Sequence, residues 1–245
     1  MAELRIGTAG WSIPRTVADA FPTDGSGLER YASRFNAAEI NTTFYRSHKP
    51  QTFERWAKST PDGFRFAVKA PKAVTHTARL ADSKAAMAAF LAETAALGDK
   101  RGPVLVQLPP SLVLDADVAN RFFDEVRSIY AGPIACEPRH ASWFTPEAEA
   151  LLGARQVARV AADPARHPDA GRPGGWSGLS YWRLHGSPDM YRSAYSDAFL
   201  AELAAALTTE SEVERWCVFD NTTLGAAARD ALVLQAMTAP ISPSA

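Results

Sequence analysis

The sequence has little cysteine, little net charge and no long apolar run, and each shortage excludes a class of protein. Its two cysteines, Cys136 and Cys217, lie within apolar stretches, so we expect two reduced, buried thiols rather than a disulfide framework. A net charge of -1 over 245 residues predicts no general attraction to nucleic acid or to an anionic membrane. No apolar stretch approaches the roughly 20 residues that span a bilayer. Because the residues after Met1 run into a strand-like segment and not a signal peptide, we predict a cytoplasmic protein.

Several catalytic motifs are also absent. The sequence contains no Gly-x-Ser-x-Gly, and neither cysteine ends a predicted strand, which disfavours covalent serine or cysteine catalysis. No glycine-rich phosphate loop follows the first predicted strand, and we predict no cofactor. There is no His-Glu-x-x-His, and we predict no metal ligand, although a barrel can also assemble ligands from distant strands.

What the sequence does have is an alternation of short strand-like runs with longer helical ones. The strands are predicted at residues 4–8, 37–41, 64–69, 103–107, 134–137, 156–161, 179–185 and 215–220. This alternation predicts a parallel sheet with helical crossovers, and eight strands are enough to close a barrel. The predicted fold class is therefore α/β, a single (β/α)8 TIM-type barrel over residues 1–239, with an open doubly wound sheet as the alternative. Residues 240–245 are predicted to form a frayed C-terminal tail.

One segment interrupts the alternation. Residues 166–176 (RHPDAGRPGGW) are too rich in proline and glycine for a regular helix and replace much of the sixth crossover. Two interpretations are open, a surface loop or a mobile lid over the pocket.

Charged and polar residues gather at the predicted carboxyl ends of the strands, where barrel enzymes place their sites. Successive residues of a strand face opposite sides of the sheet. This alternation turns five charged or titratable side chains toward the barrel interior, namely Glu39, Lys69, Glu137, Arg183 and His185. Because a buried charge costs several kcal/mol unless it is paired or used, the set indicates a functional site or a structural ion-pair network.

The residue types suggest acid/base chemistry. Glu137 or Glu39 is the expected general base and His185 or His76 its acid partner, while Lys69 binds and stabilises negative charge. The predicted substrate-binding residues lie at strand ends or on the rim. They are Asn41, Tyr45, Arg46, Gln107, Arg139, His140, Trp143, Arg183, Tyr191 and Asn221. The aromatic members serve either as rim packing or as stacking walls for a sugar or another planar molecule.

Long ordered segments at these positions match a known family. The segments are Gly7–Ser12 (GTAGWS), Glu39–Arg46 (EINTTFYR), Phe66–Pro71 (FAVKAP), Thr75-His76 with Arg79-Leu80, Leu105–Ser111 (LVQLPPS), Glu137–His140 (EPRH) with Ser142-Trp143, Arg183–Gly186 (RLHG) and Asp220–Thr222 (DNT). In these segments the chain resembles the YecE-like family of bacterial proteins of unknown function, which implies a TIM barrel and supplies no reaction. Many members carry two asparagines after the eighth strand, where this chain has Asp220-Asn221.

Three functional hypotheses follow. The first is an enzyme that acts on a small polar molecule, anionic or carbohydrate-like, by general acid/base catalysis at the carboxyl end of the barrel. The second is a metal-dependent hydrolase or isomerase in the same pocket, with His185, Glu39, Glu137 and Asp220 as ligands. The third is a non-catalytic protein that binds a metabolite or a nucleic-acid end. The near-neutral charge of the chain disfavours nucleic-acid binding. The expected partner is thus a small molecule, with no membrane contact, and composition predicts no oligomeric state.

Overall fold

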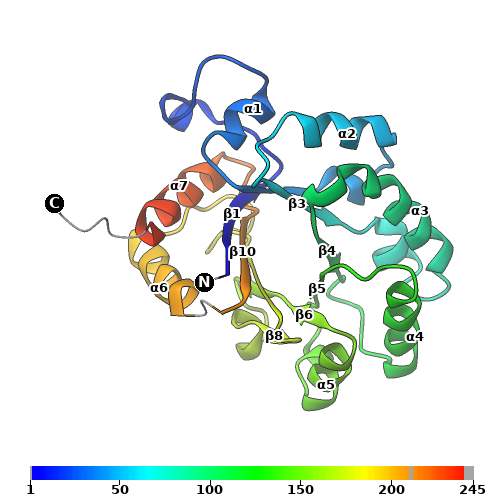
Figure 1. Cartoon of the computed structure of the whole chain (residues 1–245). Coiled ribbons are helices and arrows are strands. Elements are labelled where there is room, and N and C mark those ends of the chain that lie inside the picture. Colours follow the sequence, from blue (N-terminus) through cyan, green and yellow to red (C-terminus); the bar gives the residue numbers. More distant parts are fainter. Residues whose placement is uncertain (1, 210–211, 240–245) are drawn as a thin grey trace.

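Strands in the centre and helices around them make up the described part of the chain, residues 2–209 and 212–239 of a computed structural model (Figure 1). The tail predicted for residues 240–245 lies outside these residues. The strands are β1 (Leu4–Ala9), β2 (Ala37–Ile40), β3 (Arg65–Lys69), β4 (Arg101–Gln107), β5 (Ile134–Glu137), β6 (Val157–Arg159), β7 (Ala161–Asp163), β8 (Gly174–Gly175), β9 (Leu179–Leu184) and β10 (Glu214–Phe219). The α-helices are α1 (Gly27–Ala32), α2 (Pro50–Lys58), α3 (Lys84–Thr94), α4 (Ala116–Arg127), α5 (Pro146–Ala154), α6 (Asp197–Thr209) and α7 (Ala226–Thr238).

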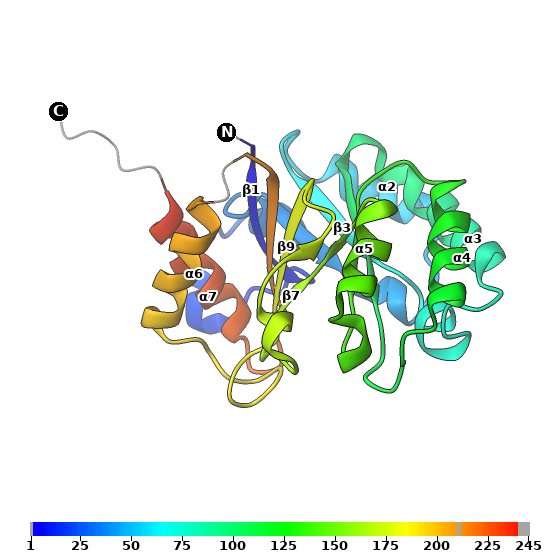
Figure 2. The same ribbon diagram turned by 90° about the horizontal axis from the view of Figure 1, so that it is seen from below.

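The sheet confirms the predicted α/β barrel. Within the described ranges its strand order is β7-β9-β10-β1-β2-β3-β4-β5-β6-β8, and every pairing except that of β6 with β8 is parallel. Helices α2–α5 cover one side of the ring of strands, and α6 and α7 cover the opposite side (Figures 1 and 2). The result is a nearly closed TIM-like barrel, in which parallel neighbours are connected by crossovers.

The sixth strand differs from its prediction, because it is split where the barrel closes. β6 pairs with β5, while β7, which follows after Val160 alone, pairs with β9. Val160 donates its N–H to Cys136 O on β5 at 2.8 Å, so one short run of chain bridges the two edges of the sheet. A strand that changes partner in mid-course looks continuous in sequence, which is why the split was not predicted.

The Pro/Gly-rich segment is fastened to the barrel wall. Buried Arg159 pairs with Glu149 of α5 and donates to the carbonyl oxygens of Asp169 and Arg172 at 2.8 and 3.1 Å. Gly175 donates its N–H to the same Glu149 carboxylate, and β8 adds to β6. This segment therefore lies where a sixth crossover helix would pack, and its polar backbone is held by one buried arginine.

Side-chain alternation divides the core into two clusters. Outward-facing residues such as Val68, Leu184 and Phe219 pack against the helices. Inside the barrel the strands on one side contribute small residues, among them Ala37, Ala67, Ala135 and Ala158, whereas β9 and β10 contribute Tyr181 and Trp216. The rings of Tyr181 and Trp216 stack at 6.0 Å with an interplanar angle of 5°. Large rings opposite alanines fill the lower barrel and leave the upper layer to polar residues.

Both cysteines are buried and unbonded, as expected, and none of the described helices is long and apolar enough to cross a bilayer.

The stacked rings of Tyr181 and Trp216 give a first prediction. Trp216→Ala removes a fully buried side chain, and the several alanines of its cluster are too short to close the gap, so we expect it to lower the free energy of unfolding by about 3–5 kcal/mol. Urea unfolding measures the loss. Tyr45→Ala, at a side chain that is 76% exposed, is the matched control and should change it by less than about 0.5 kcal/mol. Equal effects of the two substitutions would contradict this account of the core.

Candidate functional site

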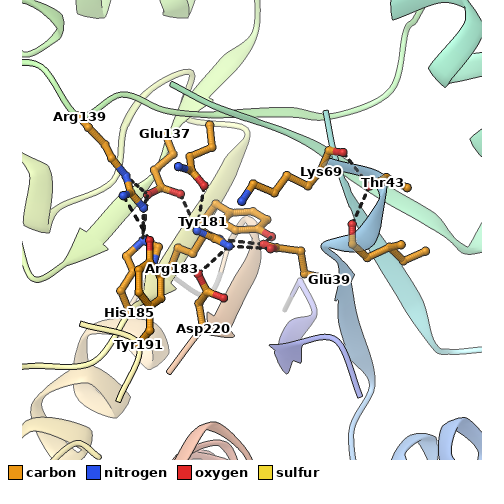
Figure 3. Close-up of polar contacts among 12 residues, drawn as sticks. Glu39, Thr43, Lys69, Glu137, Arg139, Tyr181, Arg183, His185, Tyr191 and Asp220 are labelled. Atoms are coloured by element: carbon orange, nitrogen blue, oxygen red, sulfur yellow. Dashed lines mark hydrogen bonds and ion pairs between the residues drawn. The ribbon is translucent and has the colours of Figure 1, made fainter. Parts of the chain in front are cut away.

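Arg183, near the carboxyl end of β9, lies at the centre of the barrel and is 0% exposed (Figure 3). Its guanidinium donates to both oxygens of Glu39 at 2.9 and 2.8 Å, and to Glu137 Oε2 at 3.1 Å. Nη2 also lies 2.9 Å from Asp220 Oδ2, and Nη1 lies 3.5 Å from Gln107 Oε1. Carboxylates from three parts of the barrel thus converge on one cation, and every guanidinium nitrogen has an acceptor.

Glu137, the last residue of β5, joins this cluster to the rim. Its Oε1 accepts from Arg139 Nε and Nη2 at 3.1 and 2.9 Å and lies 2.9 Å from His185 Nε2. The other ring nitrogen of His185 is 3.1 Å from Asp220 Oδ2. The imidazole is therefore clamped between two carboxylates, and both oxygens of Glu137 are engaged. We call Glu39, Glu137, Arg139, Arg183, His185 and Asp220 the inner network.

Charge pairing sets the ionisation of the inner network. Burial alone would raise the pKa of Glu137, but the charges of His185, Arg183 and Arg139 outweigh it and hold the pKa well below its ordinary 4.5. Burial would also raise the pKa of Asp220, but its interactions with Arg183 and His185 lower it. Tyr181, which donates to Glu39 at 3.3 Å, has a pKa raised by burial and by that carboxylate. The carboxylates of Glu137 and Asp220 are thus ionised acceptors at neutral pH and poorly suited to take up a proton.

Lys69 is the exception in this barrel mouth. It is the last residue of β3, its side chain reaches toward the centre in Figure 3, and only 6% of the residue is exposed. Within the described chain its Nζ makes no hydrogen bond and no ion pair, and it faces the Phe44 ring, 4.4 Å from Nζ to the centroid. Burial and the nearby charge of Arg183 lower its pKa from 10.5 to about 8, against the opposing pull of Glu39, Glu137 and Asp220. On the order of a tenth of this amine is therefore neutral at pH 7, far more than of an ordinary lysine.

His76 contacts the same aromatic ring. It lies in the short π-helical turn Ala73–Thr77, and its imidazole packs edge-on against Phe44 at 5.0 Å between centroids. Burial and then the charges of Lys69, Lys72 and Arg139 lower its pKa, so the neutral ring dominates at pH 7. Lys69 and His76 are thus two titratable groups, outside the inner network, that share one face of the barrel mouth.

The space above the inner network is small in this conformation. A cavity of about 10 Å³, the room that one water needs, is lined by Glu137, Arg139 and His185 below and by residues of the following loops above, namely Arg166, Ala170 and Met190 among others. The Tyr191 ring packs edge-on to His185 at 5.6 Å, and its hydroxyl accepts from Arg139 Nη1 at 3.5 Å. The loop after β9 therefore covers this part of the mouth.

Two amides lie beside these charges. Gln107 ends β4 in register with Glu137, and its Oε1 accepts from Arg183 at 3.5 Å. Asn41 follows β2, and its buried Oδ1 has no hydrogen-bond partner among the described residues. Asn41 and Lys69 thus leave polar capacity unused at the strand ends, which is where a ligand would contact the protein.

Three predicted substrate-binding residues contact the protein's own framework. Trp143 is 1% exposed within the helix-facing core and donates from Nε1 to Leu112 O at 3.0 Å. Asn221 is fully buried and donates to Ser193 O and Asp230 Oδ2 at 2.9 and 2.8 Å, while its Oδ1, like that of Asn41, has no hydrogen-bond partner among the described residues. His140 accepts from the N–H of Ser142 and caps a helical turn. Substrate binding by these three residues stays a prediction.

The remaining predicted binders, Tyr45 and Arg46, belong to a different cavity. They line a groove of about 290 Å³ between the loop after β2, the loop after β3 and helix α3, and no residue of the inner network lines it. Tyr45 leans edge-on against Phe44 at 4.9 Å, so the groove and the barrel mouth are separated by that ring.

The residues foreseen for a metal do not fit one. Among residues 2–209 and 212–239, no group of three or more His, Cys, Asp or Glu is arranged to hold a metal ion. Glu39, Glu137 and Asp220 converge instead on the guanidinium of Arg183, which would repel a divalent cation at that point.

Three contributors were not predicted as site residues: Phe44, Tyr181 and, outside the metal alternative, Asp220. Tyr181 shares the inward parity of Arg183, and Asp220 follows β10, so strand alternation could have indicated both. Phe44 lies in a 3-10 turn, Thr42–Phe44, where no periodicity reveals its neighbour Lys69.

The lowered pKa of Glu137 gives a pH-dependent prediction. A carboxyl whose folded pKa is depressed adds stability that is complete above the unfolded pKa and is lost as the pH falls toward the folded value. Glu137→Gln should therefore lower the free energy of unfolding by about 3–5 kcal/mol at pH 7, because Arg183 and Arg139 lose a buried partner.

The gap between wild type and Glu137→Gln should narrow below about pH 4.5. Urea titrations at several pH values measure it, with exposed Glu202→Gln as the control. A gap that stays constant through the acid range would mean that the pairing around Glu137 is not as described.

Comparison with known proteins agrees with the fold. The segment that matches the YecE protein of Escherichia coli (strain K12) is 104 residues long at 36% identity and covers 42% of this chain and 37% of YecE. The YunF protein of Bacillus subtilis matches over 151 residues at 32% identity, 58% of this chain and 52% of YunF. The chain thus matches about half or less of the length of these relatives.

Solved structures match over the whole chain. A DUF72 family protein from Enterococcus faecalis aligns with a TM-score of 0.81 at 23% identity, covering 98% of this chain and 97% of that one. D-psicose 3-epimerase from Clostridium cellulolyticum aligns with a TM-score of 0.53 at 10% identity, covering 96% and 98%. At these identities both likenesses show the fold alone. The model of a family described as "Protein of unknown function DUF72" matches residues 5–243, and the chain belongs to that family.

Proposed function

We propose that this protein is an enzyme that binds a small polar molecule, carbohydrate-like or anionic, at the carboxyl end of the barrel and transfers protons on it without a metal. The observation that carries the proposal is Lys69, a buried amine with no hydrogen bond or ion pair among the described residues. A lysine placed this way costs stability, since the burial of its charge is only partly offset by the carboxylates nearby. Such a cost is typical of a group kept for chemistry.

The inner network supports this chemistry rather than performing it. Glu137, Glu39 and His185 were expected to exchange protons, but their polar atoms are held by Arg183, Arg139 and one another. We therefore assign proton transfer to Lys69 and His76, whose lowered pKa values make neutral, proton-accepting forms available near pH 7. Arg139, at the rim of the network, is placed to stabilise a developing oxyanion.

The fold likeness supports the substrate class and no more. One protein of similar fold is a D-psicose 3-epimerase whose crystal structure was determined in the presence of D-fructose, a polyol with a carbonyl group. A ligand of that size exceeds the 10 Å³ cavity, so binding requires the loop around Met190 and Tyr191 to move outward. Tyr191 has a φ of 67°, a conformation that side-chain-bearing residues rarely adopt, and its 37% exposure fits a mobile rim.

A ligand screen by thermal shift tests binding. Neutral sugars, sugar acids, sugar phosphates and divalent metal salts are screened against wild type, Lys69→Met and exposed Lys84→Met. A ligand at 100 times its dissociation constant stabilises the folded state by about 2.7 kcal/mol. We expect at least one polyol or sugar acid to stabilise wild type and Lys84→Met, and not Lys69→Met, which folds because no carboxylate depends on Lys69 alone.

Turnover is tested with each stabilising ligand in deuterium oxide. Proton transfer predicts exchange of a carbon-bound hydrogen for deuterium, seen by NMR with wild type and lost with Lys69→Met. A hit that Lys69→Met retains in full would contradict the assigned site. Binding without exchange or conversion would instead favour a metabolite-binding protein, and a shift by metal ions alone would favour the metal-dependent alternative.

A further inference from the structure

The amine of Lys69 differs from every other lysine of the chain in what surrounds it. Lys100 is half-buried but donates to Ala57 O and Thr60 O at 2.7 and 2.5 Å. The remaining four, Lys49, Lys58, Lys72 and Lys84, are exposed to solvent. Lys69 alone combines burial with an amine that, in the described chain, has no acceptor.

One guanidinium, three carboxylates and an aromatic ring lie around this amine. Arg183 approaches it from β9, Phe44 covers it from the turn after β2, and His76 contacts that ring edge-on. The neighbouring carboxylates of Glu39, Glu137 and Asp220 are each engaged by Arg183. Local cations and loss of water both favour the neutral, nucleophilic form of an amine, and this is how enzymes activate lysine toward carbonyl carbon.

We propose that Lys69 forms a covalent imine with the carbonyl carbon of its substrate, which is a small hydroxy-aldehyde or hydroxy-ketone. The inference rests on the proposed function and narrows it. Acid/base chemistry alone requires only a substrate with an acidic hydrogen, whereas an imine requires an aldehyde or ketone group.

The step is balanced without an oxidant. The nitrogen lone pair of neutral Lys69 adds to the carbonyl carbon, a C–N bond forms as the C=O π bond breaks, and one N–H proton passes from the nitrogen to the oxygen to give a carbinolamine. Protonation of that hydroxyl, which we assign to His76 in its protonated form, releases water and leaves an iminium ion. Amine, carbonyl compound and one proton thus give iminium and one water. The iminium then draws electrons from the adjacent C–H bond, which is the bond that the proposed proton transfer breaks. The iminium nitrogen has no lone pair, so the proton of that bond passes to His76 and not to Lys69.

The lowered pKa of Lys69 supports the proposal. At pH 7 a pKa of about 8 instead of 10.5 gives a neutral-amine fraction on the order of a few hundred times larger. The charged groups that set this value come from several strands around the mouth, namely Glu39, Glu137, Arg183 and Asp220, and His76 contacts the same Phe44 ring.

Reductive trapping tests the proposal on the intact protein. The chain is incubated with dihydroxyacetone at pH 7, sodium borohydride is added, and a digest is read by mass spectrometry. We expect the reduced adduct on Lys69 at a rate on the order of 10²-fold above that on Lys72 and Lys84, which act as internal controls in the same digest. The preference should vanish when the protein is unfolded in urea before labelling.

Labelling of Lys69 no faster than of Lys72 and Lys84, or none at all, would overturn the imine. If hydrogen exchange on a bound ligand still required Lys69 in that case, the proposed function would stand, with Lys69 as a proton acceptor only. Fast labelling of Lys69 without hydrogen exchange on any ligand would support the imine and count against the proposed proton transfer.

Discussion

The burial of the Arg183 guanidinium inside the barrel is the constraint on which the rest of this structure depends. A charge removed from water costs several kcal/mol, and here the cost is offset by acceptors on every nitrogen: Glu39, Glu137, Asp220 and Gln107. Those acceptors come from β2, β5, β4 and the residue after β10. One cation therefore fixes the upper ends of strands that are distant in sequence.

The charged residues at the barrel mouth fall into two groups, those that are paired with one another and Lys69, which is not. The inner network uses its polar atoms on itself, with His185 held between Glu137 and Asp220 and with Arg139 closing the rim. Lys69, by contrast, makes no hydrogen bond or ion pair among the described residues. The carboxylates near it are paired with Arg183, and its Nζ lies over the Phe44 ring. A rigid, satisfied interior that leaves one amine unsatisfied is a physical basis for reactivity, since preorganised charges set the pKa of a group they do not bind.

The sequence predicts the barrel and the inward-facing strand residues. It does not predict how loop side chains are oriented or which strand edges pair. Strand alternation correctly turns Glu39, Lys69, Glu137, Arg183 and His185 inward, because a period of two is fixed by backbone geometry. The same reasoning cannot orient loop side chains, which is why Trp143 and Asn221 turned out to be buried and bonded to the backbone of other loops. The split of the sixth strand also escapes prediction, since it reflects which edges meet when a barrel closes. Which groups pair with one another depends on the whole fold. The sequence therefore could not show that Lys69 has no hydrogen-bond or ion-pair partner within the described chain.

The most direct test of the account is the ionisation of Lys69 itself. NMR of protein labelled with ¹³C and ¹⁵N in lysine, recorded from about pH 6 to about pH 11, follows the side-chain signals of all six lysines, and the spectrum of Lys69→Met assigns one of them to Lys69. The account predicts that the Lys69 signal titrates with a midpoint of about 8. A midpoint near 10.5 would show a fully solvated or ion-paired amine, and the central claim of an unpaired, reactive lysine would be wrong.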